Sequence, residues 1–383
     1  MNEQWIAGWG CPITHPVRDC AEWIKDTTIR LQMQMTVPGS CLKFQFSNIF
    51  GKEDVVISKA SVSVATEPRK TDIDLTRLVP VTFDGGKAQG VIPAGGFLSS
   101  DPIEFDLAAG EILSLNLYFD DFTKLTTCHR GGEAFLKRWC CDGDQTETSM
   151  LPLELASSAD VTPFIHTIEV LAAENAYSIV AFGDSITSQT WPDRLKKRLL
   201  DMGREDVAIV RKGIGGSRVL REYSSCEYYH YGPKGLDRFE REVLLQGVKK
   251  VFILHGANDL IHPSDNNPLR PMSQLPTAEE LIEGLQFYID TAHAHDIKVF
   301  LSPILPFEGY VKSYYEEREA VREKVNYWIY REAPVEGVLP FELAVLDPEN
   351  PMALRKECDS GDHLHPSGDG AQSMAESIPE EFI

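Results

Sequence analysis

The serine at position 185 has the surroundings that nucleophilic catalysis would need. It follows an apolar run at a Gly-Asp turn, in IVAFGDSITSQTWP, and precedes polar residues typical of the start of a helix. A serine nucleophile needs a base to take its proton, an acid to orient that base and donors for the oxyanion. The same position is typical of a helix N-cap. This segment alone therefore leaves both roles for Ser185 open.

A base and an acid occur together near the end of the chain. Asp362 and His365 lie three residues apart in CDSGDHLHPSGDG, so one short segment could supply both groups. His363 with His365 could instead hold a metal, but a His-x-His pair without a third ligand is weak evidence. His293 and His295 form a second such pair, on a predicted helix where they do not share a face. We expect no metal site and no cofactor.

Two further segments could supply hydrogen-bond donors. Gly216 ends the glycine-rich part of RKGIGGSRVL, where the backbone could turn an N–H toward a ligand, although a structural turn is the alternative. A dinucleotide-binding loop is disfavoured, since Arg218 stands where its last glycine would be. Asn258 follows an apolar run in VFILHGANDL and could donate its amide hydrogen or form an Asx-turn.

The elements around these residues predict an α/β domain. After about residue 173, apolar strands alternate with amphipathic helices, which is typical of a parallel sheet covered on both faces. Thr277 and Glu280 form a capping box at the start of one helix. The expected segments are residues 177–183, 193–203, 206–213, 235–245, 249–256, 277–295, 297–305, 314–332 and 338–346. Ser185, Gly216 and Asn258 then lie beyond strand ends, where such sheets place active sites.

The first part of the chain has a different pattern. Between about residues 41 and 119, short β-branched or alternating segments are separated by Gly, Pro and Asp, which favours an antiparallel sandwich. The expected strands are residues 41–50, 54–65, 78–84, 88–95 and 112–120. A chain of 383 residues is long for one domain. We therefore predict an all-β domain over 1–172 and an α/β domain over 173–383. No stripe of exposed aromatic residues can be assigned in the first domain, so a structural role is favoured there.

Composition narrows the classes of partner. A formal charge of -21 disfavours binding to nucleic acid or anionic membranes, which depends on Lys and Arg. No secretion signal and no apolar run of about 20 residues is present, so we expect a soluble cytoplasmic protein. The eight cysteines are irregularly spaced and are expected to be reduced. The oligomeric state cannot be predicted.

The four segments together resemble a known family. GDSIT, GIGGS, GAND and DHLHP, in this order, resemble the four sequence blocks of the SGNH (GDSL) hydrolase superfamily. Nearly the whole chain resembles a two-domain subgroup in which a jelly-roll-like β-sandwich precedes the hydrolase, and some members of which are acetylxylan-type esterases. The resemblance implies a flavodoxin-like α/β/α fold, with Ser185 as nucleophile, His365 as base and Asp362 as its orienting acid. The oxyanion hole would combine the N–H groups of Ser185 and Gly216 with the Asn258 side chain.

One departure from the family pattern concerns the second block. Many relatives carry asparagine two residues before its first glycine, where this chain has Arg211. How the chain supports that loop therefore cannot be predicted.

The resemblance predicts a serine esterase that removes short acyl groups, foremost O-acetyl groups, from a carbohydrate through an acyl-enzyme. A lipase or thioesterase acting on other acyl esters, or an inactive sugar-binding homologue, are the alternatives. Trp191 and His262 are candidates for substrate binding. Trp191 could stack on a sugar, although packing at the start of its helix is the favoured alternative. The loop that contains His262, IHPSDNNPLRPMSQLP, is polar and rich in proline, whereas a lipase should expose apolar surface near its site. The expected partner is a small-molecule or oligosaccharide acyl ester.

Overall fold

The computed structural model of the chain describes residues 2–16, 23–130, 137–158, 161–310 and 316–383. The chain forms two compact units. The N-terminal unit comprises Met1–Tyr177 with Gly203–Ala208, and the C-terminal unit comprises Ser178–Met202 with Ile209–Ile383. The division into domains 1–172 and 173–383 stays a prediction, since these units are defined by contacts and not by independent folding.

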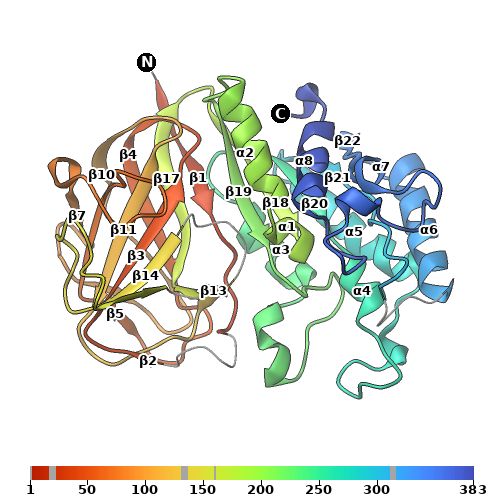
Figure 1. Cartoon of the computed structure of the whole chain (residues 1–383), viewed down its shortest axis with the longest axis horizontal. Helices are drawn as coiled ribbons and strands as arrows, with labels where there is room; N and C mark the ends of the chain where they lie inside the picture. The colour runs from red at the N-terminus through yellow and green to blue at the C-terminus, as the bar shows by residue number, and fades with distance from the viewer. Residues whose placement is uncertain (1, 17–22, 131–136, 159–160, 311–315) are drawn as a thin grey trace. The chain divides into compact units, whose positions relative to one another are not determined.

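The N-terminal unit is built from two antiparallel sheets (Figure 1). In the first sheet the order is β1-β17-β4-β10, and β9 also pairs with β4; in the second it is β15-β14-β3-β11-β6-β7. The strands of the first sheet are β1 (Glu3–Gly10), β4 (Gly39–Ser47), β9 (Phe97–Ser99), β10 (Ile103–Leu107) and β17 (Ile165–Ala173). Those of the second are β3 (Thr27–Gln34), β6 (Lys59–Val64), β7 (Val79–Val81), β11 (Ile112–Phe119), β14 (Lys137–Asp142) and β15 (Ala156–Ser158). Shorter ladders join β2 (Trp23–Ile24) to β12 (Thr123–Lys124), β5 (Val55–Ile57) to β8 (Gly90–Ile92), and β13 (Cys128–Arg130) to β16 (Val161–Pro163).

The two sheets share one hydrophobic core, which makes the unit a sandwich. Phe44 and Val170 from the first sheet belong to the same buried cluster as Leu31 and Leu115 from the second. Alternation along a strand produces this arrangement: in β10, buried and exposed residues alternate at every position. The prediction of an all-β first region is confirmed. Several strands that were not predicted extend it, including β1 and β3 before residue 41 and β14 and β17 after residue 119.

The C-terminal unit contains a sheet of order β19-β18-β20-β21-β22. Its strands are β18 (Tyr177–Gly183), β19 (Val207–Gly213), β20 (Val248–Leu254), β21 (Lys298–Leu301) and β22 (Gly337–Val338). The pairs β18–β20, β20–β21 and β21–β22 are parallel. Counted along the chain this order is 2-1-3-4-5, the flavodoxin-like order of doubly wound sheets, which confirms the predicted fold class.

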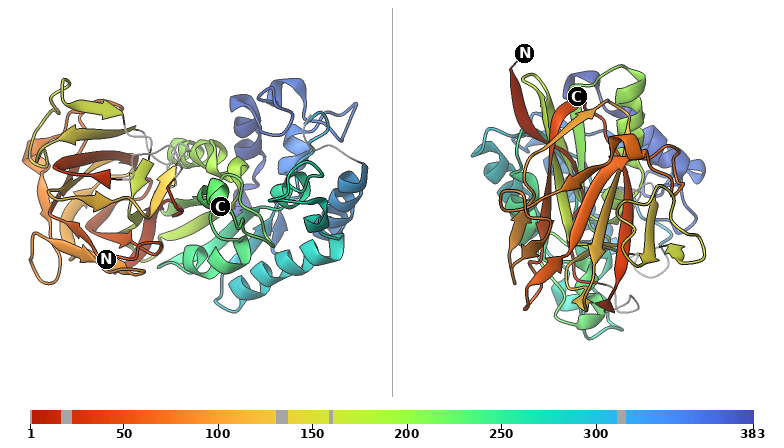
Figure 2. Two further views of the ribbon diagram at one scale, coloured as in Figure 1. Left: turned by 90° about the horizontal axis from the view of Figure 1, so that it is seen from below. Right: turned by 90° about the vertical axis from the view of Figure 1, so that its left-hand side faces the viewer.

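Helices cover this sheet. They are α1 (Ser185–Ser188), α2 (Trp191–Asp201), α3 (Gly235–Val243), α4 (Ala257–Ile261), α5 (Ala278–His293), α6 (Glu316–Arg331), α7 (Phe341–Val345) and α8 (Gly368–Ser377). Helix α8 contacts α2 and α7, whereas α5 contacts α3 and α6. The left view of Figure 2 shows the cyan helix α5 and the dark blue helix α8 on opposite sides of the unit. The predicted capping box of Thr277 and Glu280 is confirmed at the start of α5.

Some sequence predictions fall partly outside the described residues. The helix predicted over 314–332 is observed as α6, and residues 314–315 lie outside the description. Cys20 lies outside it as well; no disulfide joins the seven cysteines that are described. No helix in the described ranges is long and apolar enough to cross a membrane.

Candidate functional site

Ser185, His365 and Asp362 form a continuous hydrogen-bonded chain at the carboxyl end of the sheet. The Ser185 hydroxyl lies 2.8 Å from Nε2 of His365, and Nδ1 of the same imidazole lies 2.6 Å from Oδ2 of Asp362. Since Asp362 accepts the Nδ1 proton, Nε2 is left to accept the serine proton. Ser185 and His365 are only partly buried, so a ligand can reach them. The arrangement can deprotonate the serine as it attacks.

Asp184, and not Ser185, is the helix cap at this turn. The Asp184 side chain accepts the N–H of Ile186 at 3.0 Å at the start of α1. The capping role that the sequence left open for Ser185 is therefore taken by its neighbour, and the Ser185 hydroxyl is directed to His365. The residue before Asp184 must be glycine, because a Cβ on Gly183 would lie 2.0 Å from the Leu254 carbonyl oxygen of the adjacent strand.

The loop 359–366 fixes the charge and direction of Asp362. Oδ1 of Asp362 accepts the N–H groups of Leu364 at 3.0 Å and His365 at 2.8 Å. Partial burial disfavours ionisation, but the hydrogen bonds from the His365 side chain and from these two N–H groups outweigh it and lower the pKa of Asp362 to about 2. The carboxylate is therefore ionised at neutral pH and can stabilise an imidazolium.

His363 faces a different partner from His365. It has a positive φ of 64°, and its Nδ1 lies 2.7 Å from Asp359. No group of three or more His, Cys, Asp or Glu within the described residues could hold a metal ion.

The residues expected to form the oxyanion hole are Ser185 at the start of α1, Gly216 in the loop after β19 and Asn258 in the first turn of α4. A Cβ on Gly215 would be 3.9 Å from the Ser185 Cβ, which places this glycine turn beside the serine. The adjacent Gly216 has a φ of +79°, a conformation that glycine adopts without strain. One amide hydrogen of Asn258 is donated to the Ser217 carbonyl at 2.9 Å, and an amide nitrogen carries a second. The N–H of Ser185 begins α1, where no i−4 carbonyl is available to it.

Asp259 fixes the segment that directly follows Gly216. Its two carboxylate oxygens accept the N–H groups of Val219 at 2.7 Å and Leu220 at 3.0 Å. Burial raises the pKa of Asp259 to about 6, against the lowering effect of these hydrogen bonds. The residue next to Asn258 thus joins α4 to the loop that carries Gly216.

Two buried arginines hydrogen-bond to the backbone on either side of Ser185. Sequence reasoning did not assign these roles. Arg211 donates to the Ser188 carbonyl at 3.0 Å, at the end of α1, and forms an ion pair with Asp193. Arg211, the residue that departs from the family pattern, therefore supports the helix that begins with Ser185. Arg238 donates to the Gly183 carbonyl at 2.7 Å.

Arg238 also joins the ends of two strands to α3. It donates to the Lys212 carbonyl at 2.9 Å and pairs with Glu242 at 2.8 Å, and both charged side chains are fully buried. An arginine and a glutamate four residues apart normally indicate an exposed helix face. Their spacing alone could not have revealed this role.

The two substrate-binding candidates differ in their surroundings. Trp191 is 1% exposed and packs against Phe341, with ring centroids 4.9 Å apart, so it has the packing role that was favoured for it over sugar stacking. His262 is 9% exposed, and its Nδ1 bonds with the Tyr223 hydroxyl. Burial lowers the pKa of His262 to about 3, so it is neutral at physiological pH.

His262 belongs to an aromatic group next to Gly216. We call Tyr223, Tyr228, Tyr231 and His262 the tyrosine cluster. Tyr231 stacks on His262 with centroids 5.7 Å apart, and a Cβ on Gly216 would lie 2.4 Å from the Tyr231 ring. No motif indicated this cluster, although four tyrosines within nine residues could have drawn attention to the segment.

The C-terminal unit is an open doubly wound α/β domain with polar side chains at the carboxyl ends of its strands, the usual position of catalytic sites in such sheets. Residues 181–372, half of the chain, match the model of the GDSL-like lipase/acylhydrolase family. The chain belongs to this family and is a carboxylic ester hydrolase. No curated protein matches it.

Solved structures of similar fold come from several bacteria. A GDSL-like lipase from Bacteroides thetaiotaomicron is 19% identical over 54% of this chain and 87% of its own, with a TM-score of 0.37. A lipase/acylhydrolase from Enterococcus faecalis is 21% identical over 52% of this chain and 92% of its own, with a TM-score of 0.38. A variant of an acetyl xylan esterase from Geobacillus stearothermophilus is 18% identical over 52% of this chain and 92% of its own, with a TM-score of 0.40.

Proposed function

We propose that this ester hydrolase removes short acyl groups, foremost O-acetyl groups, from a carbohydrate, with Ser185 as the nucleophile. The observation that carries the proposal is the hydrogen-bonded chain from Ser185 through His365 to Asp362. Asp362 is the orienting acid, because its ionised carboxylate holds the imidazole in the tautomer that can accept a proton at Nε2.

In the first half of the reaction, the Ser185 oxygen attacks the ester carbonyl while Nε2 of His365 takes the serine proton. The negative charge that develops on the carbonyl oxygen is stabilised by the N–H groups of Ser185 and Gly216 and by the second amide hydrogen of Asn258. Collapse of this intermediate breaks the bond to the sugar oxygen, which receives the proton from His365 and leaves as the alcohol. An acyl-serine remains.

The second half repeats these steps with water. His365 takes a proton from a water molecule, whose oxygen attacks the acyl-serine carbonyl and forms a second oxyanion. Breaking the bond to Ser185 releases the carboxylic acid, and the proton held by His365 returns to the serine oxygen. Both halves use the same donors, so the substitutions that weaken one also weaken the other.

The tyrosine cluster supports a sugar ester over a long-chain ester. Its rings have flat apolar faces and polar edges, a combination that suits a sugar ring better than an extended alkyl chain. Tyr231 lies directly against Gly216, so an aromatic ring lies beside this expected oxyanion donor. The loop after Asn258 adds exposed polar residues, among them Asp265 and Asn266.

Acetate release from a panel of acetylated xylo-oligosaccharides and other acetylated sugars tests the substrate class. A series of 4-nitrophenyl esters of increasing acyl length tests the acyl group, and we expect acetyl to be preferred. A preference for acyl chains of eight carbons or more would contradict the sugar-ester proposal in favour of a lipase. Labelling by a fluorophosphonate tests the nucleophile: a site that fails to label would indicate an inactive homologue.

A further inference from the structure

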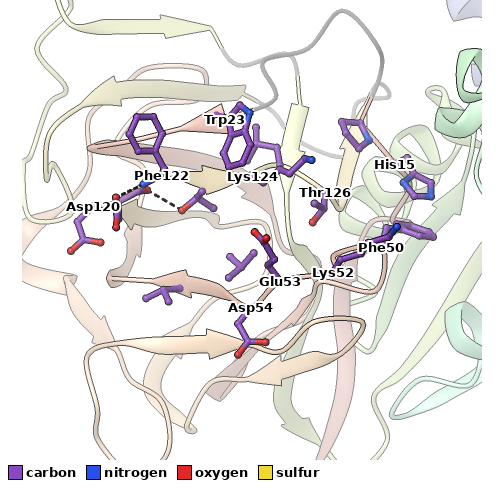
Figure 3. A pocket seen from close by; sticks show the side chains of 16 residues that line it. His15, Trp23, Phe50, Lys52, Glu53, Asp54, Asp120, Phe122, Lys124 and Thr126 are labelled. Carbon is purple, nitrogen blue, oxygen red and sulfur yellow. Dashed lines mark hydrogen bonds between the residues drawn. The ribbon is translucent and has the colours of Figure 1, made fainter.

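The N-terminal unit contains a cavity of about 550 Å³ (Figure 3). This volume lies within the range of about 300–1,000 Å³ that small-molecule sites occupy. The residues that line it come from β2, β5, β12 and the loops beside them, and all belong to the N-terminal unit. None of them belongs to the proposed ester-hydrolysing site.

Aromatic rings exposed to solvent distinguish this cavity. Trp23 is 47% exposed and Phe122 is 66% exposed, whereas large apolar side chains are normally buried. Phe50 contributes a third ring to the lining. In Figure 3, Trp23 and Phe122 lie at one side of the cavity and Phe50 lies at another, with Glu53 between them. The sequence alone did not assign these rings to one exposed surface, because they lie far apart in the chain.

The two exposed rings are held in place by backbone pairing. Trp23 lies opposite Lys124 in the short ladder of β2 and β12, and Phe122 precedes this ladder. The Lys124 ammonium lies 5.4 Å from the Trp23 ring centroid, and the Lys25 ammonium lies 4.6 Å from that of Phe122. These cation–π contacts favour a fixed orientation of each ring while its surface stays open. The rings are thus positioned before a ligand arrives.

Charged groups surround the rings. Four carboxylates, those of Glu53, Asp54, Asp120 and Asp121, and two ammonium groups, those of Lys52 and Lys124, line the cavity. Asp54 and Asp120 already accept hydrogen bonds, from the Ala94 N–H and the Ser58 hydroxyl. Within the described residues no side-chain hydrogen bond engages the carboxylate of Glu53, which is exposed. Glu53 can therefore accept hydrogen bonds from a ligand.

We propose that this cavity binds a neutral oligosaccharide. The excess of carboxylates disfavours phosphates, nucleic acid and other anions. Flat apolar rings beside hydrogen-bond acceptors match a sugar ring, which has an apolar C–H face and a rim of hydroxyl donors. One sugar ring stacks on Trp23 or Phe122, and Glu53 accepts from its hydroxyl groups. The inference concerns binding alone; only the choice of xylan fragments as the first probe rests on the proposed function.

Titration of the full chain with unacetylated oligosaccharides tests this site without any ester being hydrolysed. The panel contains xylo-, cello-, manno- and arabino-oligosaccharides, and binding is measured by calorimetry and by protection of tryptophan fluorescence from iodide quenching. Trp23 is the most exposed of the six tryptophans, so it dominates the quenching. We expect at least one sugar to bind with a Kd on the order of 1 mM and to protect this fluorescence.

Matched variants identify the surface that binds. Trp23→Ala should weaken binding about tenfold or more, and Trp23→Phe, which keeps an aromatic face, should restore most of it. Phe97→Ala is the control, because Phe97 is also 47% exposed in the same unit but does not line the cavity. Glu53→Gln should weaken binding without changing the melting temperature.

Three results would overturn the proposal: no sugar in the panel binds, Trp23→Ala binds as well as wild type, or Phe97→Ala weakens binding equally. Failure of acetate release with intact binding would contradict the proposed function and leave this site standing. Loss of binding with intact acetate release would do the reverse.

Discussion

The two units arrange their polar side chains in different ways. In the C-terminal unit, the candidate site residues are fixed by hydrogen bonds: Asp362 accepts two backbone N–H groups and pairs with His365, and Asn258 donates to the Ser217 carbonyl. In the N-terminal cavity, Trp23 and Phe122 are exposed, and Glu53 has no side-chain hydrogen bond within the described residues. Bond-breaking chemistry needs groups held within about 0.5 Å, whereas a binding surface needs mainly the right shape and donors.

The buried arginines of the two units differ in the acceptors that they bond. Arg238 in the C-terminal unit pairs with a buried carboxylate, Glu242, and reaches the carbonyl groups at two strand ends. Arg30 in the sandwich is fully buried and donates to neutral acceptors, the Asn116 side chain and the Thr71 carbonyl among them. Burial lowers the pKa of Arg30 to about 10. The first arginine holds the ends of two strands beside the candidate site, whereas the second joins loops of the sandwich.

Ser185→Ala should give the largest effect and should separate the two regions. If Ser185 is the nucleophile, turnover of 4-nitrophenyl acetate falls about 10⁵- to 10⁶-fold, since removing an activated serine disables the whole group. Fluorophosphonate labelling should be lost, while the melting temperature and sugar binding at the Trp23 cavity stay unchanged. A variant that keeps more than a few per cent of wild-type turnover would exclude this serine as nucleophile.

Asp362→Asn should be the next largest. The amide cannot stabilise an imidazolium and can leave the imidazole in the wrong tautomer, so kcat should fall about 10²- to 10⁴-fold. Because the pKa of Asp362 is about 2, the wild-type carboxylate is charged throughout an assay from pH 5 to 9. Lowering the pH in that range therefore should not reproduce the effect of the substitution.

Asp359→Asn is the matched control for this variant. Asp359 lies in the same loop and pairs with His363, as Asp362 does with His365. The Asp359→Asn variant should lower kcat far less than Asp362→Asn does. Equal losses in the two variants would mean that the loop as a whole, and not the Asp362 carboxylate, determines the rate.

Asn258→Ala tests a single oxyanion donor. Loss of one such donor costs about 100- to 1,000-fold in kcat, with a smaller change in KM, because the charge exists mainly in the transition state. Asn266→Ala, in the exposed loop that follows, should leave kcat unchanged. If Asn258→Ala raised KM and left kcat intact, Asn258 would bind the ground state instead of the oxyanion.

The sequence located the candidate site residues because the signal for each of them is local, and their catalytic roles stay a prediction. Ser185, Gly216 and Asn258 each follow an apolar strand within a few residues, and Asp362 and His365 share one loop, so strand pattern and spacing predicted their positions. The direction of a side chain is not local. Trp191 is directed toward Phe341 by packing between α2 and α7, segments far apart in the chain. Its sequence neighbours therefore could not identify this partner, although packing at the helix start was the favoured role.

Features that depend on distant pairing were missed for the same reason. The Trp23 cavity forms because β2 pairs with β12, which brings residues about a hundred positions apart into one surface. Arg238 and Glu242 have the spacing of an exposed ion pair, and only the packing of α3 against the sheet buries them. Hydrophobic pattern locates elements, but the partner of each element decides which polar groups lie inside.

Asp184→Asn should give the smallest effect, and this effect should be a gain in stability at alkaline pH, not a loss of activity. Burial raises the pKa of Asp184 to about 7, although the Ile186 N–H bonds to one of its oxygens. A carboxyl whose pKa is raised in the folded state contributes most stability below about pH 4, and loses it as the pH rises through 7. Asparagine does not titrate and keeps the capping oxygen. At pH 8 the variant should therefore melt about 2–4 °C higher, equivalent to about 1 kcal/mol in a unit of this size, and the difference should vanish toward pH 4.

Asp259→Asn tests whether neutralising any buried carboxylate near Ser185 stabilises the fold, or only one that accepts a single backbone hydrogen bond. The pKa of Asp259 is also raised by burial, to about 6, but both of its oxygens accept backbone N–H groups. An amide offers only one acceptor oxygen, so the variant leaves one buried N–H without a partner, which costs about 1–3 kcal/mol. Asp259→Asn should therefore not melt above wild type at any pH. A rise in both variants would mean that buried charge alone, and not the number of hydrogen bonds each carboxylate accepts, controls the stability of the turns around Ser185.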